Sequence, residues 1–228
     1  GVTSPDQLQM TDSLGQAVPA QFTVLARWGG ALEDASKPIK WILADFQANV
    51  AADSSAVYHL KNGTSPAHPT PIVVSESAGE YEINTGRARF IVSKTSFHLF
   101  DQIYVDRDGN STLNESVLNG TGRITAAYNG ISYYADTFLP EETALEINGP
   151  LHTVLRVRGW LKDASGANTL LAYTARLHFY AGKQTVRLEF TVWNDNLIVN
   201  DGSGQPDIKE FGSPNTVLFD DLSISLQM

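Results

Sequence analysis

The feature that most constrains the fold of this chain is an alternation of apolar residues with a period of two. In residues 22–50, two such runs flank a polar connection that starts at Gly29 and ends at Pro38. Alternating β-branched and aromatic residues, interrupted by glycine and proline, are typical of a β-hairpin. Because both runs carry apolar groups on two faces, we expect this hairpin inside a barrel or sandwich, with Trp28 and Trp41 in the core.

Shorter alternating runs continue along the rest of the chain. Residues 97–105 read as one strand, and Asn129-Gly130 joins two further runs, which is the strongest hairpin signal in the sequence. Long runs follow from residue 143, before a polar stretch at residues 195–214. The pattern predicts an all-β fold, an antiparallel barrel or sandwich with little or no helix, as a single domain over residues 1–228.

Composition removes several classes of function. The 228 residues include no cysteine, which excludes thiolate zinc sites, disulfides and thiol redox chemistry. A formal net charge of −9 argues against non-specific binding to nucleic acid or to anionic membranes. No apolar run approaches the ~18 residues that a membrane-spanning helix needs. We therefore expect neither nucleic acid nor a membrane as partner.

The candidate binding surface follows from the phase of three long strands. If these strands form a meander, one outer face presents arginine and aromatic side chains, namely Arg156, Arg158, Trp160, Arg176, Tyr180, Arg187 and Trp193. Guanidinium groups offer paired donors to carboxylates, and aromatic rings give sugars a flat apolar partner. This face is therefore a candidate site for an acidic polysaccharide such as pectin.

The alternative is an ordinary exposed sheet face. Polar outer faces are the default for antiparallel sheets, and here Arg158, Arg187, Glu146 and Glu189 would form cross-strand ion pairs. The sequence leaves both interpretations open and favours the ion-paired face.

The loop DRDGN offers oxygen ligands at alternate positions, Asp106, Asp108 and Asn110, as calcium loops do. Its glycine stands at the fourth place rather than the sixth, and the twelfth place is Val117 rather than a glutamate. A simple Asp-Gly turn is the better interpretation, with calcium as the less favoured one. No other cofactor is expected.

No motif identifies a catalytic residue. The chain has no G-x-S-x-G, phosphate loop or Rossmann glycine pattern, and its five histidines show no metal-ligand spacing. Carboxylates are plentiful, so a pair of glycosidase acids far apart in the sequence stays open as an alternative.

Four stretches, in their order along the chain, carry a resemblance to a known family. They are ARW…IKWILADF at residues 26–46, INTGRARFIVSK at 83–94, INGPLHTVLRVRGW at 147–160 and LHFYAGKQTVRLEFTVWN at 177–194. Together they resemble the N-terminal RIFT-barrel domain of exo-rhamnogalacturonan-lyase-like proteins. The long connection GGALEDASKP departs from the family pattern.

The resemblance implies a RIFT-barrel-like N-terminal part of a longer, secreted or periplasmic polysaccharide lyase. The family's catalytic cleft is expected in a downstream helical toroid domain, so no catalytic residue is carried over to this chain. Its role would be that of a non-catalytic accessory domain, which braces the catalytic domain and holds acidic polysaccharide. The alternatives are a carbohydrate lyase or hydrolase with its site inside this chain, and a purely structural or adhesion module.

Overall fold

The structure, a computed structural model, describes residues 1–194 and 217–228 and contains no α-helix among them. In this described part of the chain, one 3-10 turn at Pro5–Gln7 precedes the strands, which form four sheets. The all-β fold expected from the alternation is thereby confirmed. The polar stretch at residues 195–214 lies outside the described residues.

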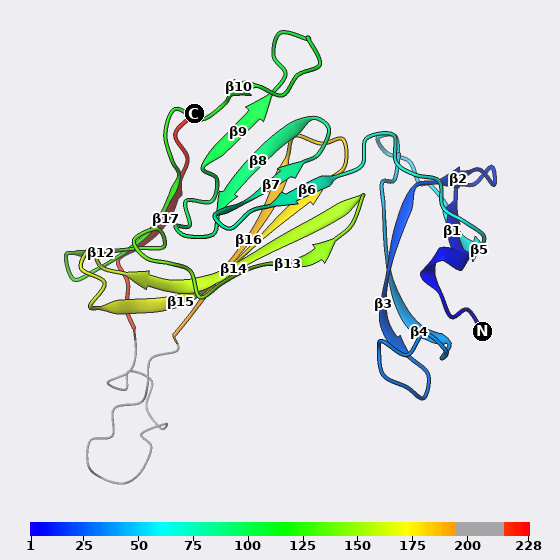
Figure 1. Cartoon of the computed structure of the whole chain (residues 1–228), viewed down its shortest axis with the longest axis horizontal. Coiled ribbons are helices and arrows are strands. Elements are labelled where there is room, and N and C mark those ends of the chain that lie inside the picture. Colours follow the sequence, from blue (N-terminus) through cyan, green and yellow to red (C-terminus); the bar gives the residue numbers. More distant parts are fainter. Residues whose placement is uncertain (195–216) are drawn as a thin grey trace.

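The N-terminal lobe, residues 1–71, holds two small sheets (Figure 1). Its strands are β1 (Leu8–Thr11), β2 (Ala17–Val18), β3 (Ala20–Arg27), β4 (Ile39–Phe46) and β5 (His59–Asn62). β1 stands between β2 and β5, whereas β3 and β4 make a two-stranded sheet of their own, called the β3–β4 hairpin below.

The remaining strands form the sandwich, whose first layer is a five-stranded meander. Its strands are β6 (Val73–Glu76), β7 (Glu80–Asn84), β8 (Ala88–Ser93), β9 (Gln102–Val105) and β10 (Glu115–Ser116). They lie side by side in the order β10-β9-β8-β7-β6. The strand expected at residues 97–105 is thus only partly correct, since the first half of that stretch is a loop.

The second layer is a seven-stranded sheet. Its strands are β11 (Arg123–Tyr128), β12 (Ile131–Tyr134), β13 (Glu142–Asn148), β14 (His152–Lys162), β15 (Thr169–Tyr180), β16 (Val186–Trp193) and β17 (Asp221–Ser225). The order is β16-β15-β14-β12-β11-β17, with β13 also paired to β14. Asn129 and Gly130 join β11 to β12 with φ of 56° and 78°, and positive φ at both positions is what a two-residue type I′ hairpin turn requires.

The hydrophobic core lies between these two layers. Ile83 and Phe90 from the first layer meet Leu155 and Phe179 from the second, all at most 2% exposed. The ring centroids of Phe90 and Phe179 are 5.2 Å apart. Among the described residues, every buried member of this cluster lies between positions 72 and 181, so the core belongs to the sandwich and not to the lobe.

The predicted core around the two indoles is wrong. Trp28 is 60% exposed and Trp41 is 63% exposed. Alternation shows that a strand has two faces, but it does not show what covers each face. The β3–β4 hairpin pairs with no other strand among the described residues, and its exposed indoles are left without a covering layer. The ammonium of Lys40 lies 4.6 Å from the Trp28 ring centroid.

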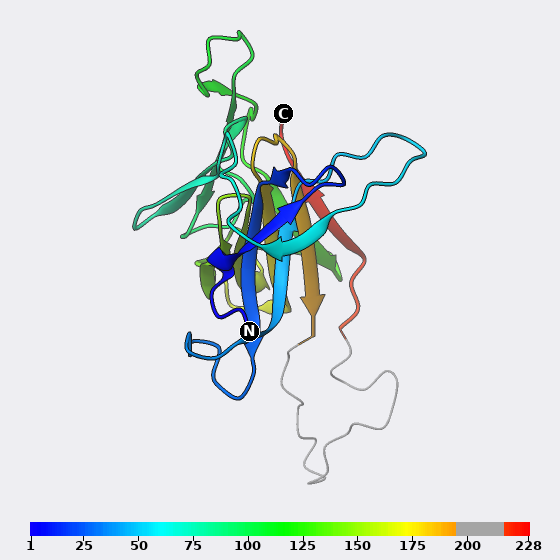
Figure 2. The same cartoon turned by 90° about the vertical axis from the view of Figure 1, so that its right-hand side faces the viewer.

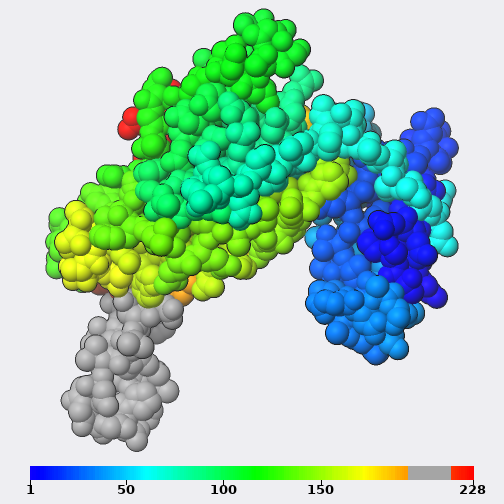
Figure 3. All heavy atoms as spheres, in the orientation of Figure 1, coloured from blue at the N-terminus to red at the C-terminus, as the bar shows by residue number. Residues whose placement is uncertain are grey.

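The lobe stands beside one end of the sandwich (Figure 1) and lies in front of it when viewed from that end (Figure 2). The space-filling view shows a hollow between the lobe and the outer side of the seven-stranded sheet (Figure 3). Tyr180, one of the residues predicted to bind ligand, lines the junction of the sheet with the lobe, together with Asp45 and Phe46 of the lobe.

Candidate functional site

The strand phase predicted for the candidate binding face is correct. On β14, Leu155 and Val157 point into the core and are 0% exposed. Arg156, Arg158 and Trp160 alternate with them and are intermediate or exposed. The pairing register places Arg176 directly opposite Arg156 and Arg187 directly opposite His178, so the predicted residues of β14, β15 and β16 share the outer face of the seven-stranded sheet.

Each arginine predicted on this face is paired with a glutamate. The N–O distances are 2.7 Å for Arg156–Glu142, 3.7 Å for Arg158–Glu142, 2.5 Å for Arg176–Glu146 and 2.6 Å for Arg187–Glu189. The hydrogen bond from Arg176 lowers the pKa of Glu146, and the hydrogen bond to Glu142 raises the pKa of Arg156. The ion-paired interpretation therefore describes these arginines, with β13 supplying two of the acids. Binding of a polysaccharide here stays a prediction.

The aromatic side chains of the face are not gathered into one platform. Trp160 and Trp193 lie in one cross-strand row, on either side of Ala172. The indole Nε1 of Trp160 donates to Glu141 Oε1 at 2.8 Å. Tyr180 lies at the other end of β15 and stacks on His152, with ring centroids 4.9 Å apart.

A string of polar side chains joins the lobe to this face. Asp45 Oδ1 on β4 is 3.0 Å from His152 Nδ1, and His152 Nε2 is 3.0 Å from His178 Nδ1. His178 Nε2 is 3.6 Å from Glu189 Oε2 on β16. Burial lowers the pKa of His178, and the nearby His152 and Arg187 act in the same direction, while Glu189 opposes them. Sequence reasoning missed this string because its members come from four strands.

The predicted calcium loop is a self-bonded turn. Asp106 Oδ1 accepts the backbone N–H groups of Gly109 and Asn110 at 2.8 and 3.1 Å. The amide Nδ2 of Asn110 donates to Asp108 Oδ2 at 2.9 Å. One carboxylate oxygen from each of Asp106, Asp108 and Glu115 lies within 4.8 Å of the other two, so Glu115 of β10 joins the two predicted acids. The loop is thus the Asp-Gly turn favoured by the sequence, and calcium binding stays a prediction.

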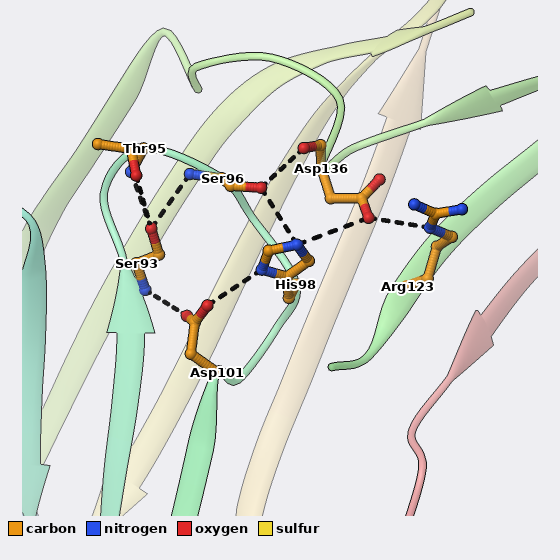
Figure 4. A network of polar contacts seen from close by, with 7 residues as sticks. All are labelled: Ser93, Thr95, Ser96, His98, Asp101, Arg123 and Asp136. Atoms are coloured by element: carbon orange, nitrogen blue, oxygen red, sulfur yellow. Dashed lines mark hydrogen bonds and ion pairs between the residues drawn. The ribbon is translucent and has the colours of Figure 1, made fainter. Parts of the chain in front are cut away.

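A second network, absent from the sequence-based predictions, lies in the loop between β8 and β9 (Figure 4). His98 Nδ1 is 3.0 Å from Asp101 Oδ1, and its Nε2 is 3.2 Å from Ser96 Oγ and 3.7 Å from Asp136 Oδ2. The Asp136 side chain is only 4% exposed and pairs with Arg123 Nε at 2.9 Å. Leu99, in the same loop, has a φ of 70°, which is uncommon for a residue other than glycine.

His98 lies within hydrogen-bonding distance of both Ser96 and Asp101. This is the arrangement of a catalytic nucleophile, a general base and an acid that orients the base. However, Ser96 Oγ donates to the backbone carbonyl of Asp136 at 2.7 Å, so its proton is directed away from the imidazole. The contacts also tie this loop to the end of β12, which is a structural role. Strand phase does not reveal these contacts, since Asp136 lies 40 positions from Ser96.

The fold and its surfaces define a class of protein, an antiparallel β-sandwich with a small β-lobe and an ion-paired outer face. A family model described as the PcRGLX-like protein central beta sandwich domain matches residues 72–201, more than half of the chain. The chain belongs to this rhamnogalacturonan lyase-like family. A search of curated proteins found no match.

The family expected from the sequence is thereby confirmed, and the matched domain is a β-sandwich. The match starts at Ile72, where the core of the sandwich also starts. The RIFT-barrel part of the resemblance, which included residues 26–46 of the lobe, stays a prediction. No helix in the described part of the chain is long and apolar enough to cross a membrane.

Proposed function

We propose that this chain is a non-catalytic accessory β-domain of a secreted or periplasmic polysaccharide-degrading protein. Its outer face and the adjoining lobe brace a neighbouring catalytic domain and hold acidic polysaccharide. The observation that supports this role most directly is the hollow between the lobe and the outer face (Figure 3).

The hollow is bordered by an apolar surface that lacks a covering layer. Gln21 and Asp45 are paired across the β3–β4 hairpin and both contact His152 on β14. Residues two positions apart on a strand share a face, so the same face continues through Leu43 and Trp41. These side chains are 37% and 63% exposed. Contiguous exposed apolar groups rimmed by charge are typical of an interaction site.

The outer face supplies the polar half of this surface. Its guanidinium groups are held in place by glutamates, and a guanidinium with one paired edge still has N–H groups for sugar hydroxyls or carboxylates. Trp160 and Trp193, both partly exposed, add ring surface at one end of the strands.

The test is binding and turnover with the purified chain. Affinity electrophoresis in pectin should retard the chain more than electrophoresis in a neutral polysaccharide, and Arg158→Ala and Trp160→Ala should reduce that retardation. No unsaturated product should form from pectic polymers. Turnover by this chain would overturn the non-catalytic role, and unchanged retardation of both variants would overturn the proposed face.

The network around His98 is the observation that favours the second candidate, an enzyme with its site inside this chain. That function predicts turnover on a pectic polymer that His98→Gln removes while the variant remains folded. If the purified chain shows no turnover, or if His98→Gln leaves turnover unchanged, this candidate fails.

A further inference from the structure

A cavity of about 490 Å³ lies where three turns of the sandwich meet, away from the outer face. It is lined by the β7–β8 turn, by the loop between β9 and β10, and by Gln184 of the β15–β16 turn. Its volume falls within the roughly 300–1,000 Å³ typical of small-molecule sites. None of its lining residues belongs to the face discussed above.

The walls of this cavity are held together by hydrogen bonds. Gln184 Nε2 donates to the carbonyl of Arg87 at 3.3 Å, and Thr85 Oγ1 donates to the carbonyl of Lys183 at 2.6 Å. On the opposite side, the carboxylate of Asp106 accepts the N–H of Ser111 at 3.0 Å. Gly86 and Ser111 both have positive φ, 79° and 66°. Positive φ is uncommon at a serine, and such backbone is concentrated at functional sites.

The two arginines of the cavity differ in what they contact. Arg89 is committed to the wall, because it pairs with Glu82 at 2.9 Å and its Cζ lies 4.1 Å from the Tyr104 ring centroid. The guanidinium of Arg87 is exposed and makes no hydrogen bond or ion pair within residues 1–194 and 217–228. A carboxylate that binds Arg87 therefore has no protein acid to displace, unlike one that approaches the arginines of the outer face.

The other polar groups around Arg87 suit hydroxyls. Asn84 accepts the N–H of Gly86 through its Oδ1 at 2.8 Å, which leaves its amide Nδ2 directed elsewhere. The side-chain hydroxyls of Ser111 and Thr112 have no partner in the described part of the chain. Amides and hydroxyls both donate and accept, as recognition of a polyol requires.

We propose that this cavity binds an acidic sugar, with its carboxylate on Arg87 and its hydroxyls on Asn84, Ser111 and Thr112. This goes beyond the accessory role, because it gives the sandwich a site for a single acidic residue that is independent of the outer face. The cavity offers one free guanidinium beside several neutral hydrogen-bonding groups, and its one carboxylate, that of Asp106, already accepts the backbone N–H groups of Gly109, Asn110 and Ser111. This is the chemistry of a monocarboxylate rather than of a polyanion.

The test is titration calorimetry on the purified chain with galacturonic acid, and with galactose as the matched neutral sugar. The acid should bind, and galactose should bind at least about tenfold more weakly, as expected for loss of a charge-assisted hydrogen bond. Arg87→Gln should weaken binding of the acid by a similar factor, and Thr112→Val by less. Lys61→Gln, an exposed residue of β5 that lines neither the cavity nor the outer face, should leave it unchanged.

The wall of the cavity uses the backbone carbonyl of Arg87 and not its side chain, so thermal unfolding of Arg87→Gln should match that of the parent. Absence of binding, equal binding of galactose, or unchanged affinity in Arg87→Gln would each overturn the proposal. Loss of binding in Arg158→Gln with retention in Arg87→Gln would place the sugar on the outer face and overturn it as well.

Discussion

The sandwich and the N-terminal lobe are both built from antiparallel strands, yet they are stabilised differently. In the sandwich, β14 and β15 each contain a run of consecutive buried residues and a run in which buried and partly exposed residues alternate, and Leu155 and Leu177 are fully buried. In the β3–β4 hairpin no residue is buried, and Trp41 is among the exposed ones. Apolar strand residues therefore stabilise a fold only where a second layer covers them.

The difference also separates the part of the chain that has its own core from the part that depends on a neighbour. An isolated two-stranded ribbon is marginal in water. The lobe is attached to the sandwich through Gln21, Asp45 and Gln47, which contact the start of β14 and the end of β15. The comparison predicts large effects in the core, smaller ones at the junction, and the smallest on the outer face.

The largest expected effect is that of Leu155→Ala, which should lower the free energy of unfolding by about 2–5 kcal/mol because it opens a cavity in the core. Trp41→Ala removes a larger side chain, but this side chain is exposed, so the free energy of unfolding should change by no more than about 0.5 kcal/mol. Urea unfolding of both variants measures the contrast. Equal losses would show that the hairpin has a covered face after all.

At the junction, Gln21→Ala should cost about 1–3 kcal/mol, since it leaves polar backbone groups of a partly buried site without partners. The Oε1 of Gln21 accepts the N–H groups of Leu151 and His152, and its Nε2 donates to the carbonyl of His152. Each of these hydrogen bonds is 3.1 Å long. Gln47→Ala, which removes a single bond to Ala181, is the matched control and should cost less. Faster proteolysis of the lobe in Gln21→Ala, with the sandwich intact, would confirm the attachment; identical digestion of the two variants would contradict it.

A pH dependence should follow from His178, which faces His152, Arg187 and Glu189 and whose pKa is lowered chiefly by burial. The unfolded chain then binds the proton more readily than the folded one. Stability contributed by the neutral imidazole is present above the unfolded value of about 6.5 and is lost as pH falls through the lower folded value. Unfolding midpoints between pH 7.5 and 5 should decline less in His178→Gln than in the parent. Parallel curves would contradict this prediction.

The smallest effect is expected for the ion pairs of the outer face. Arg176 and Glu146 are about one-third exposed, and such pairs contribute about 0.2–1 kcal/mol. A double-mutant cycle with Arg176→Ala and Glu146→Ala measures the coupling directly, and it should decrease as salt is added. A coupling well above that range, insensitive to salt, would mean that the face is shielded from solvent.

Much of the fold could be predicted because local rules decide it. Period-two alternation correctly placed Leu155 in the core and Arg156 outside it, and Asn129-Gly130 marked a hairpin through its positive-φ requirement. The same rule failed at Trp41, since burial depends on which layer lies above a strand. It also failed at residues 97–101, where Leu99 adopts a φ that a strand does not allow.

The candidate site was less predictable, because it depends on pairing between distant segments. Phase alone put the arginines of β14 and β15 on one face, but Glu142 and Glu146 reach them only because β13 lies beside β14. The Arg87 cavity brings together turns about 100 positions apart, through Gln184 and the carbonyl of Arg87. The sequence does not show which strands and turns are neighbours in the fold. Without that information, Arg87 cannot be distinguished from the arginines that are paired with glutamates.

The string from Asp45 to His178 admits one arrangement of protons when both imidazoles are neutral. A carboxylate only accepts, so His152 carries its hydrogen on Nδ1 and accepts at Nε2, and His178 must then carry its own on Nδ1 as well. Both imidazoles are thus Nδ1–H tautomers, and each N–H donates in the direction of the lobe. If the lobe separated from the sandwich, Asp45 would no longer select this tautomer. The nitrogen chemical shifts of these two histidines therefore report whether the lobe is docked.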